Sequence, residues 1–101
     1  MEVTKTQLLY LCPKLGNDYY VTRIDFENVI IKDIRSEFQF EISFLNPLPS
    51  RLKANIYVWQ MKDAVRIIEQ IYEIKTLPKL KKVLNELTNK YNSMNISDIQ
   101  Y

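Results

Sequence analysis

The sequence contains no histidine, one glycine and one cysteine in 101 residues. The missing histidine removes the commonest general base and the commonest metal ligand. A single glycine cannot form the glycine-rich loops that hold nucleotide phosphates. The lone Cys12 cannot form an intramolecular disulfide, and no histidine is present to activate its thiol. We therefore expect no catalytic residue, no metal and no cofactor, and we expect Cys12 to be a small buried apolar side chain.

Long apolar runs are also absent. The longest run near the N-terminus covers five residues, 8–12, whereas a membrane span needs about 20 and a signal peptide also needs a longer apolar core. We expect a cytoplasmic protein with no membrane partner. The composition, with twelve Ile and ten Lys but two Ala, is typical of small proteins of viruses and mobile elements, for which the location would be the host cytoplasm.

The chain is long enough for one domain, residues 1–101, and too short for two. Apolar alternation and β-branched residues predict that residues 1–59 are mainly strands. Residues 60–92 form two helices in this interpretation, and residues 93–101 are a tail. The five predicted strands cover residues 3–12, 19–26, 29–32, 38–44 and 52–59, with a hairpin turn at Glu27-Asn28.

Helical periodicity predicts helices over residues 60–74 and 77–92. Thr76 is a suitable N-cap for the second helix, and Pro78 fits its first turn. The predicted fold class is α+β: an antiparallel four- to five-stranded meander sheet, followed by a C-terminal two-helix hairpin packed on one face.

Aromatic residues divide between the two faces of the predicted sheet. Phe38, Phe40 and Phe44 alternate with polar residues, so we expect them in the core. Tyr19, Tyr57 and Trp59 belong to a second aromatic face. If these three are exposed together, they form the kind of patch that marks a protein interface.

The helical half carries a local excess of positive charge. Residues 75–90 contain five Lys and one Glu, whereas residues 1–74 contain nine Lys or Arg and ten Asp or Glu. A helical wheel places Lys75, Lys79, Lys82 and Lys90 within one arc, with Glu86 in its middle. Such a stripe either contacts a nucleic-acid backbone or is an ordinary solvated helix face.

The acidic residues Asp25, Glu27 and Asp33 cluster near a predicted hairpin, but their spacing matches no metal-dependent nuclease motif. We therefore predict a small non-catalytic protein that binds a macromolecule. The simplest version is a protein of a virus or mobile element that binds or modulates a partner protein. The alternative is sequence-independent nucleic-acid binding through the basic C-terminal helix. An unpaired edge strand would also permit a homodimer.

Overall fold

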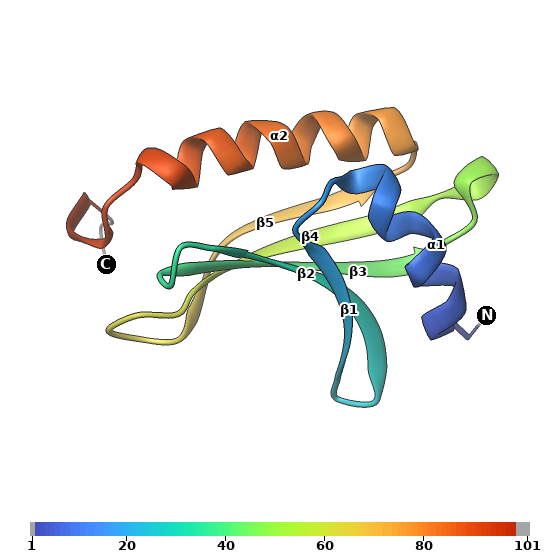
Figure 1. The fold of residues 1–101 in the computed structure, drawn as a ribbon, viewed down its shortest axis with the longest axis horizontal. Helices are drawn as coiled ribbons and strands as arrows, with labels where there is room; N and C mark the ends of the chain where they lie inside the picture. The colour runs from blue at the N-terminus through green and yellow to red at the C-terminus, as the bar shows by residue number, and fades with distance from the viewer. Residues whose placement is uncertain (1, 99–101) are drawn as a thin grey trace.

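A computed structural model describes residues 2–98 and shows a five-stranded antiparallel sheet with two helices (Figure 1). The strands lie in the sheet in the order in which they occur in the chain, β1-β2-β3-β4-β5. The elements are α1 (Lys5–Leu15), β1 (Tyr19–Ile24), β2 (Glu27–Ile34), β3 (Phe38–Asn46), η1 (Pro49–Arg51), β4 (Lys53–Gln60), β5 (Arg66–Ile74), α2 (Leu77–Ser93) and η2 (Ile96–Asp98). The predicted α+β class and antiparallel meander are confirmed.

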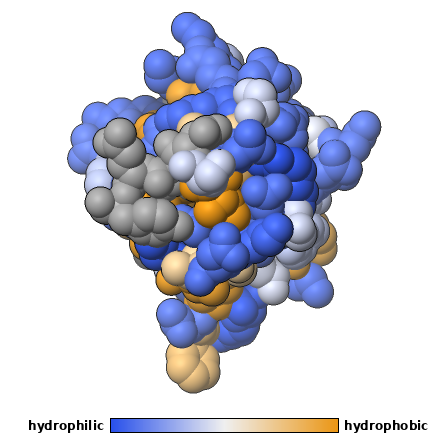
Figure 2. Space-filling view, turned by 90° about the vertical axis from the view of Figure 1, so that its left-hand side faces the viewer, coloured by the Kyte–Doolittle hydropathy of each residue, from blue (hydrophilic) through white to orange (hydrophobic). Residues whose placement is uncertain are grey.

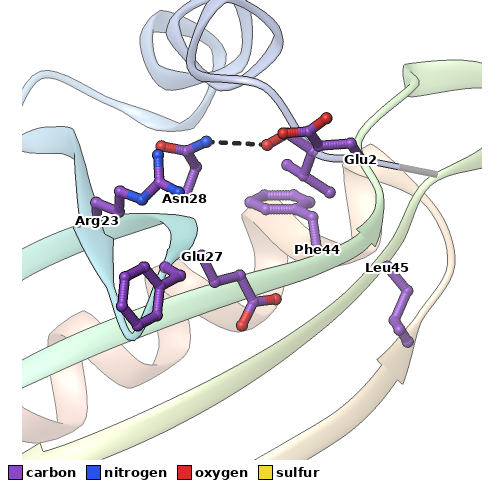
Figure 3. A pocket seen from close by; sticks show the side chains of 8 residues that line it. Glu2, Arg23, Glu27, Asn28, Phe44 and Leu45 are labelled. Atoms are coloured by element: carbon purple, nitrogen blue, oxygen red, sulfur yellow. Dashed lines mark hydrogen bonds between the residues drawn. The ribbon is translucent and has the colours of Figure 1, made fainter.

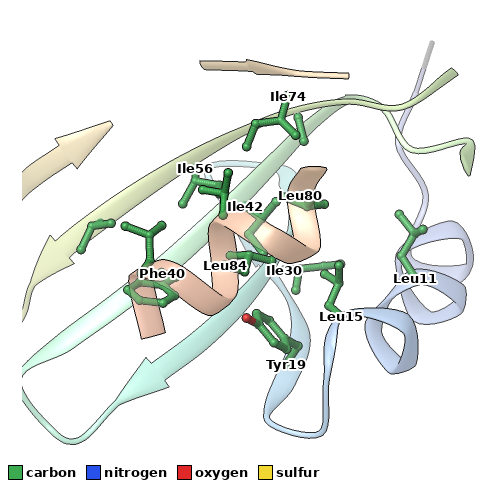
Figure 4. Close-up of a cluster of buried hydrophobic side chains, with 14 of the residues drawn as sticks. Leu11, Leu15, Tyr19, Ile30, Phe40, Ile42, Ile56, Ile74, Leu80 and Leu84 are labelled. Carbon is green, nitrogen blue, oxygen red and sulfur yellow. The ribbon is translucent and has the colours of Figure 1, made fainter. Parts of the chain in front are cut away.

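Both helices pack on the same face of the sheet and enclose the core (Figures 1 and 4). The core follows from the alternation of β3, from Phe38 to Phe44, and of β4, in which every second residue is buried. The apolar stripe of α2 lies on these strands. The fully buried side chains of this cluster include Leu8, Leu11, Ile30, Phe38, Phe40, Ile42, Ile56, Leu80 and Leu84.

The predicted second helix is confirmed as α2. Thr76 is its N-cap, and the Thr76 hydroxyl accepts a hydrogen bond from the Lys79 backbone N–H at 3.3 Å. Pro78 occupies the first turn, where no intrahelical N–H is needed. At the other end, the Arg35 guanidinium donates to the backbone carbonyl oxygens of Tyr91 and Met94. The Arg35 contacts hold the C-terminal end of α2 against the sheet.

The strand predicted over residues 3–12 is wrong, because this segment forms α1. Thr4 caps the helix in a capping box. The Thr4 hydroxyl accepts a hydrogen bond from the Gln7 backbone N–H, and the Gln7 side-chain oxygen accepts one from the Thr4 backbone N–H. Leu8, Leu11, Cys12 and Leu15 are buried, a helical spacing that places them on one side. Pro13 lies inside the last turn of the helix rather than ending a strand.

The helix predicted over residues 60–74 is also wrong, because residues 66–74 form β5, and the predicted two-helix hairpin is therefore a single helix, α2. Two register shifts in the β4–β5 pairing explain the error. One leaves Ile68 as an extra residue, and the other places two residues opposite Asn55. These bulges interrupt the alternation of apolar side chains, so Ile67, Ile68, Ile71 and Ile74 acquire a spacing that resembles a helix.

The first hairpin turn lies two residues earlier than predicted. Asp25 and Phe26 form it, with φ angles of 49° and 66°, whereas Glu27 and Asn28 already belong to β2. Positive φ at both turn residues matches the tight hairpin turns that suit the twist of paired strands.

Candidate functional site

The face of the sheet opposite the two helices is free of helices in the part of the chain that the structure describes (Figure 1). We call it the open face. The β1–β2 hairpin and the β4–β5 loop both bend away from α2, so the open face is concave (Figure 1). Val29 and Ile31 belong to it by strand alternation but are only 1% exposed. Side chains of the neighbouring strands therefore cover the floor of this face.

Tyr57 and Trp59 lie on the open face, as strand alternation predicted. Tyr57 pairs with Glu41 and Trp59 with Gln39 across β3 and β4. The Trp59 indole N–H donates to Glu41 Oε1 at 3.0 Å. The Tyr57 ring meets the Tyr72 ring edge-on, with centroids 6.0 Å apart. Both predicted residues are half-buried, because their own neighbours on the face partly cover them.

Tyr19 does not join them, so the predicted three-residue patch is not formed. Tyr19 pairs with Lys32, which pairs in turn with Phe40 of the core, and this register places Tyr19 on the helix-covered face. Its side chain is 8% exposed, and the Lys32 ammonium lies 4.8 Å from its ring centroid. Burial, opposed by a hydrogen bond with Thr88, raises the pKa of Tyr19 to about 12.

The open face instead gathers exposed apolar side chains that the sequence analysis did not assign to a site. Among residues 2–98, six of the ten exposed large apolar side chains lie on this face or at its rim. Phe26 is 91% exposed, Val65 66% and Tyr72 54%. Five of them are Tyr20, Met61, Val65, Ile67 and Tyr72. The sixth, Phe26, lies in the β1–β2 turn at the rim of the face, where it also lines a cavity next to Arg23. Figure 2 shows apolar side chains among polar ones in the lower half of that view, the level at which the β1–β2 turn and the β4–β5 loop lie.

A shallow apolar groove crosses the open face, with a volume of about 190 Å³. Ile24 of β1, Trp59 of β4, and Met61 and Val65 of the β4–β5 loop line it together with Gln39 and Glu41. The backbone N–H of Met61 donates to the Glu37 carbonyl oxygen at 2.7 Å, which fixes the start of this loop to the end of the β2–β3 turn. The groove is therefore bounded by side chains of the sheet and by one loop.

Carboxylates lie among these apolar side chains and accept hydrogen bonds from neutral donors. Asp33 accepts from the Tyr20 hydroxyl and from the Gln39 amide, both at 2.9 Å. Glu27 accepts from the Ser43 hydroxyl at 3.2 Å.

Glu41 is the carboxylate most affected by its surroundings. Burial raises the pKa of the Glu41 carboxyl, and the nearby charges of Glu27 and Asp25 raise it further, while the Trp59 hydrogen bond opposes them. The open face is therefore aromatic and acidic.

The four predicted lysines do not form one continuous stripe. Lys79 and Lys82 are exposed on the outer side of α2, and Lys75 precedes the N-cap of the helix. Lys90 instead points to β5, where its ammonium pairs with Glu69 Oε1 at 2.9 Å. Lys81, which the sequence analysis did not include, is exposed on the same helix.

A second cavity, of about 300 Å³, lies where the segment before α1 crosses the ends of β2 and β3 (Figure 3). The Asn28 amide donates to the Val3 carbonyl oxygen at 3.0 Å beside it. Arg23 lies on one side, and Glu2 and Glu27 also line the cavity. These opposite charges are all exposed, and the residues offer no nucleophile with an adjacent base.

Cys12 is buried, as predicted, and burial raises the pKa of its thiol. Within residues 2–98, no three His, Cys, Asp or Glu side chains lie close enough to hold a metal ion. In the same residues, no helix is long and apolar enough to cross a membrane.

Comparisons with protein-family models, with curated proteins and with solved structures each return no match to this chain.

Proposed function

We propose that this chain is a non-catalytic protein-binding module and that its open face is the contact surface. The observation that carries the proposal is the concentration of exposed apolar side chains on a concave face that lies outside the main core cluster. Protein interfaces are enriched in Tyr, Trp, Phe and Met, and this face presents all four types. Contacts centred on large aromatic side chains supply most of the binding energy in such interfaces.

Phe26 is the clearest sign that the face serves something other than stability. It occupies a turn position with φ of 66° and is almost fully exposed. A bulky residue at positive φ costs the fold about 1 kcal/mol or more, and Asn or Gly would fit this position better. The side chain makes little contact that would offset the cost, so its contribution belongs to a contact outside this chain.

Phe26→Gly tests the proposal because it should improve the fold and weaken binding together. The variant creates an Asp-Gly turn, and we expect it to raise the free energy of unfolding by about 0.5–1 kcal/mol. Capture of partner proteins from a lysate of the source cells should fall, as it should for Val65→Ser. Leu9→Ser, which removes an apolar side chain that is 51% exposed on α1, is the control from the other side of the molecule. Equal capture by all three variants and the parent chain would contradict the proposal.

Nucleic-acid binding through α2 is the second candidate. Lys79, Lys81 and Lys82 are exposed and form no ion pair within the described residues. Lys90 is withdrawn from this surface by Glu69, so fewer phosphates could be contacted than the sequence suggested. Fluorescence anisotropy with labelled DNA and RNA should show affinity that falls with salt and is lost in Lys79→Glu/Lys82→Glu. Salt-independent or unchanged binding would contradict this candidate.

A further inference from the structure

Charge is distributed unequally between the two faces of the molecule. The outer helix α2 carries Lys79, Lys81 and Lys82 against Glu86. On the open face and its rim lie Asp25, Glu27, Asp33 and Glu41, while Lys53 and Lys62 are confined to one end of β4 and to the β4–β5 loop. The surface that we propose as the protein contact is therefore the acidic side of the molecule.

The carboxylates at the centre of the open face have no cationic partner in the described part of the chain. The ion pairs within residues 2–98 are Arg35–Glu37 and Lys90–Glu69, and both lie away from the open face. Asp33, Glu27 and Glu41 receive only neutral N–H and O–H donors. Each carboxylate has two oxygens and about four acceptor sites, so these groups retain capacity for a donor supplied from outside.

The aromatic rings add a second preference for positive charge. Trp59, Tyr57, Tyr72 and Tyr20 surround the carboxylates. An Arg guanidinium or a Lys ammonium over such a ring is attracted by the negative charge of the ring face. Arg also bonds a carboxylate through two parallel N–H groups. The apolar walls of the groove, with Glu41 at its edge, suit the long aliphatic stem and charged tip of one basic side chain.

Two other occupants fit the same face poorly. A second copy related by a two-fold axis would place carboxylates opposite carboxylates, because the same patch occurs on both sides of such an interface. A nucleic acid would bring phosphates to the same carboxylates. Both arrangements cost like-charge repulsion at a partly desolvated surface.

We propose that the open face binds a basic segment of a partner protein, with Lys or Arg side chains placed between the carboxylates of Asp33 and Glu41 and the rings around Trp59. The inference rests on the proposed function and specifies the chemistry of the partner. Apolar residues of the segment cover Met61, Val65 and Tyr72, and its basic residues supply the charge that the face lacks.

The single tryptophan of the chain is Trp59, so its emission reports directly on this groove. The probe is the peptide (Arg-Ala-Leu-Ala)₃, and the comparison peptides replace every Arg by Gln or by Glu. We expect a saturable change in Trp59 emission with the Arg peptide at low salt, at least about tenfold weaker binding of the Gln peptide, and no response to the Glu peptide. Raising the salt concentration should weaken binding of the Arg peptide.

Asp33→Asn/Glu41→Gln should weaken the Arg peptide about threefold to tenfold. The matched control, Asp18→Asn/Glu86→Gln, removes the same number of charges away from the open face and should change affinity less than about twofold.

Three results would overturn the inference. They are an equal loss of affinity in both double variants, equal affinity for the Gln peptide, and a change in Trp59 emission caused by self-association or by DNA. The proposed function fails separately, if capture from lysate is independent of Phe26 and Val65. If capture is lost in the Phe26 and Val65 variants but not in Asp33→Asn/Glu41→Gln, the proposed function stands and the inference of a basic partner is wrong.

Discussion

Glu69 connects the edge strand β5 to the last turns of α2. Its Oε1 accepts hydrogen bonds from the Tyr91 hydroxyl at 2.7 Å and from the Lys90 ammonium at 2.9 Å. The Tyr91 ring in turn packs against Phe38 and Phe40, with centroids 4.9 and 5.9 Å away. Burial alone would raise the pKa of Glu69, but the two hydrogen bonds and the Lys90 charge outweigh it, so the pKa lies below its ordinary value of 4.5.

This lowered pKa predicts that Glu69 stabilises the fold at neutral pH and stops doing so in acid. The unfolded chain binds the Glu69 proton more readily than the folded one, so the contribution is complete above pH 4.5 and is lost as the pH falls through the lower folded-state pKa. We expect Glu69→Gln to cost about 1 kcal/mol or less at pH 7, because the pair is partly exposed, and nothing in strong acid.

Urea unfolding of the parent chain and of Glu69→Gln across the acid range measures this difference. Glu73→Gln, at an exposed position of the same strand, is the control for general effects of removing a charge. A difference between parent and Glu69→Gln that does not shrink with acid would show that the carboxylate charge is not what Lys90 and Tyr91 recognise.

At the scale of single residues, the alternation of apolar and polar side chains is enough to locate part of the site. β4 buries every second residue, so the sequence alone places Tyr57 and Trp59 on the opposite face. β1 has apolar side chains on both faces, so alternation cannot decide which face Tyr19 occupies. Only the pairing of Tyr19 with Lys32 decides it. This register depends on both strands, so it cannot be derived from the sequence of β1 alone.

At the scale of elements, α2 and β3 are predictable because the apolar residues of each follow a single period, that of a helix in α2 and that of a strand in β3. α1 carries a local helix signal in the capping box of Thr4 and Gln7, which the apolar, β-branched character of its sequence outweighed in the strand prediction. β5 offers no such signal, because its two bulges replace alternation by a spacing that also fits a helix. The sequence therefore predicts a helix that includes Val65, in the loop before β5, and Tyr72, in β5, and gives no sign that both belong to the open face.

Gly16, the only glycine of the chain, ends α1 and permits the turn into β1. Its φ is 148° and ψ is −178°, a region that is essentially restricted to glycine. A Cβ at this position would also lie 3.2 Å from the Tyr19 ring. We expect Gly16→Ala to lower the free energy of unfolding by about 1–3 kcal/mol, measured by urea denaturation. Thr6→Ala, an exposed change within α1, should stay within about 0.5 kcal/mol; comparable losses in the two variants would contradict this role for Gly16.

At the scale of the whole molecule, the two faces of the sheet carry different kinds of side chain. The helix-covered face holds nearly all of the core, whereas the open face concentrates exposed apolar side chains and carboxylates that lack an ion-pair partner within residues 2–98. The sheet positions the side chains of the open face, because the alternation of each strand presents them on one side.

The same charge distribution predicts that the chain is a monomer when it is alone. β5 is an edge of the sheet, but its two bulges disturb the regular backbone that an added strand would need. Pairing through the open face is opposed by its carboxylates. We expect sedimentation velocity to give a single species near 12.1 kDa at micromolar concentrations. A dimer that persists at low salt would contradict this expectation and would revive the edge-strand homodimer.

The order of strands in the sheet has a consequence for how the chain folds. Each strand pairs with the next one in the sequence, so every pairing closes only a short connection and costs little chain entropy. α2 differs, since its contacts with β2 and the following turn, such as Lys32 with Thr88 and Arg35 with Tyr91, join residues 56 positions apart. The hairpins should therefore form early, and α2 should dock last. During synthesis, much of the apolar helix-covered face remains open to the solvent until the residues of α2 have emerged.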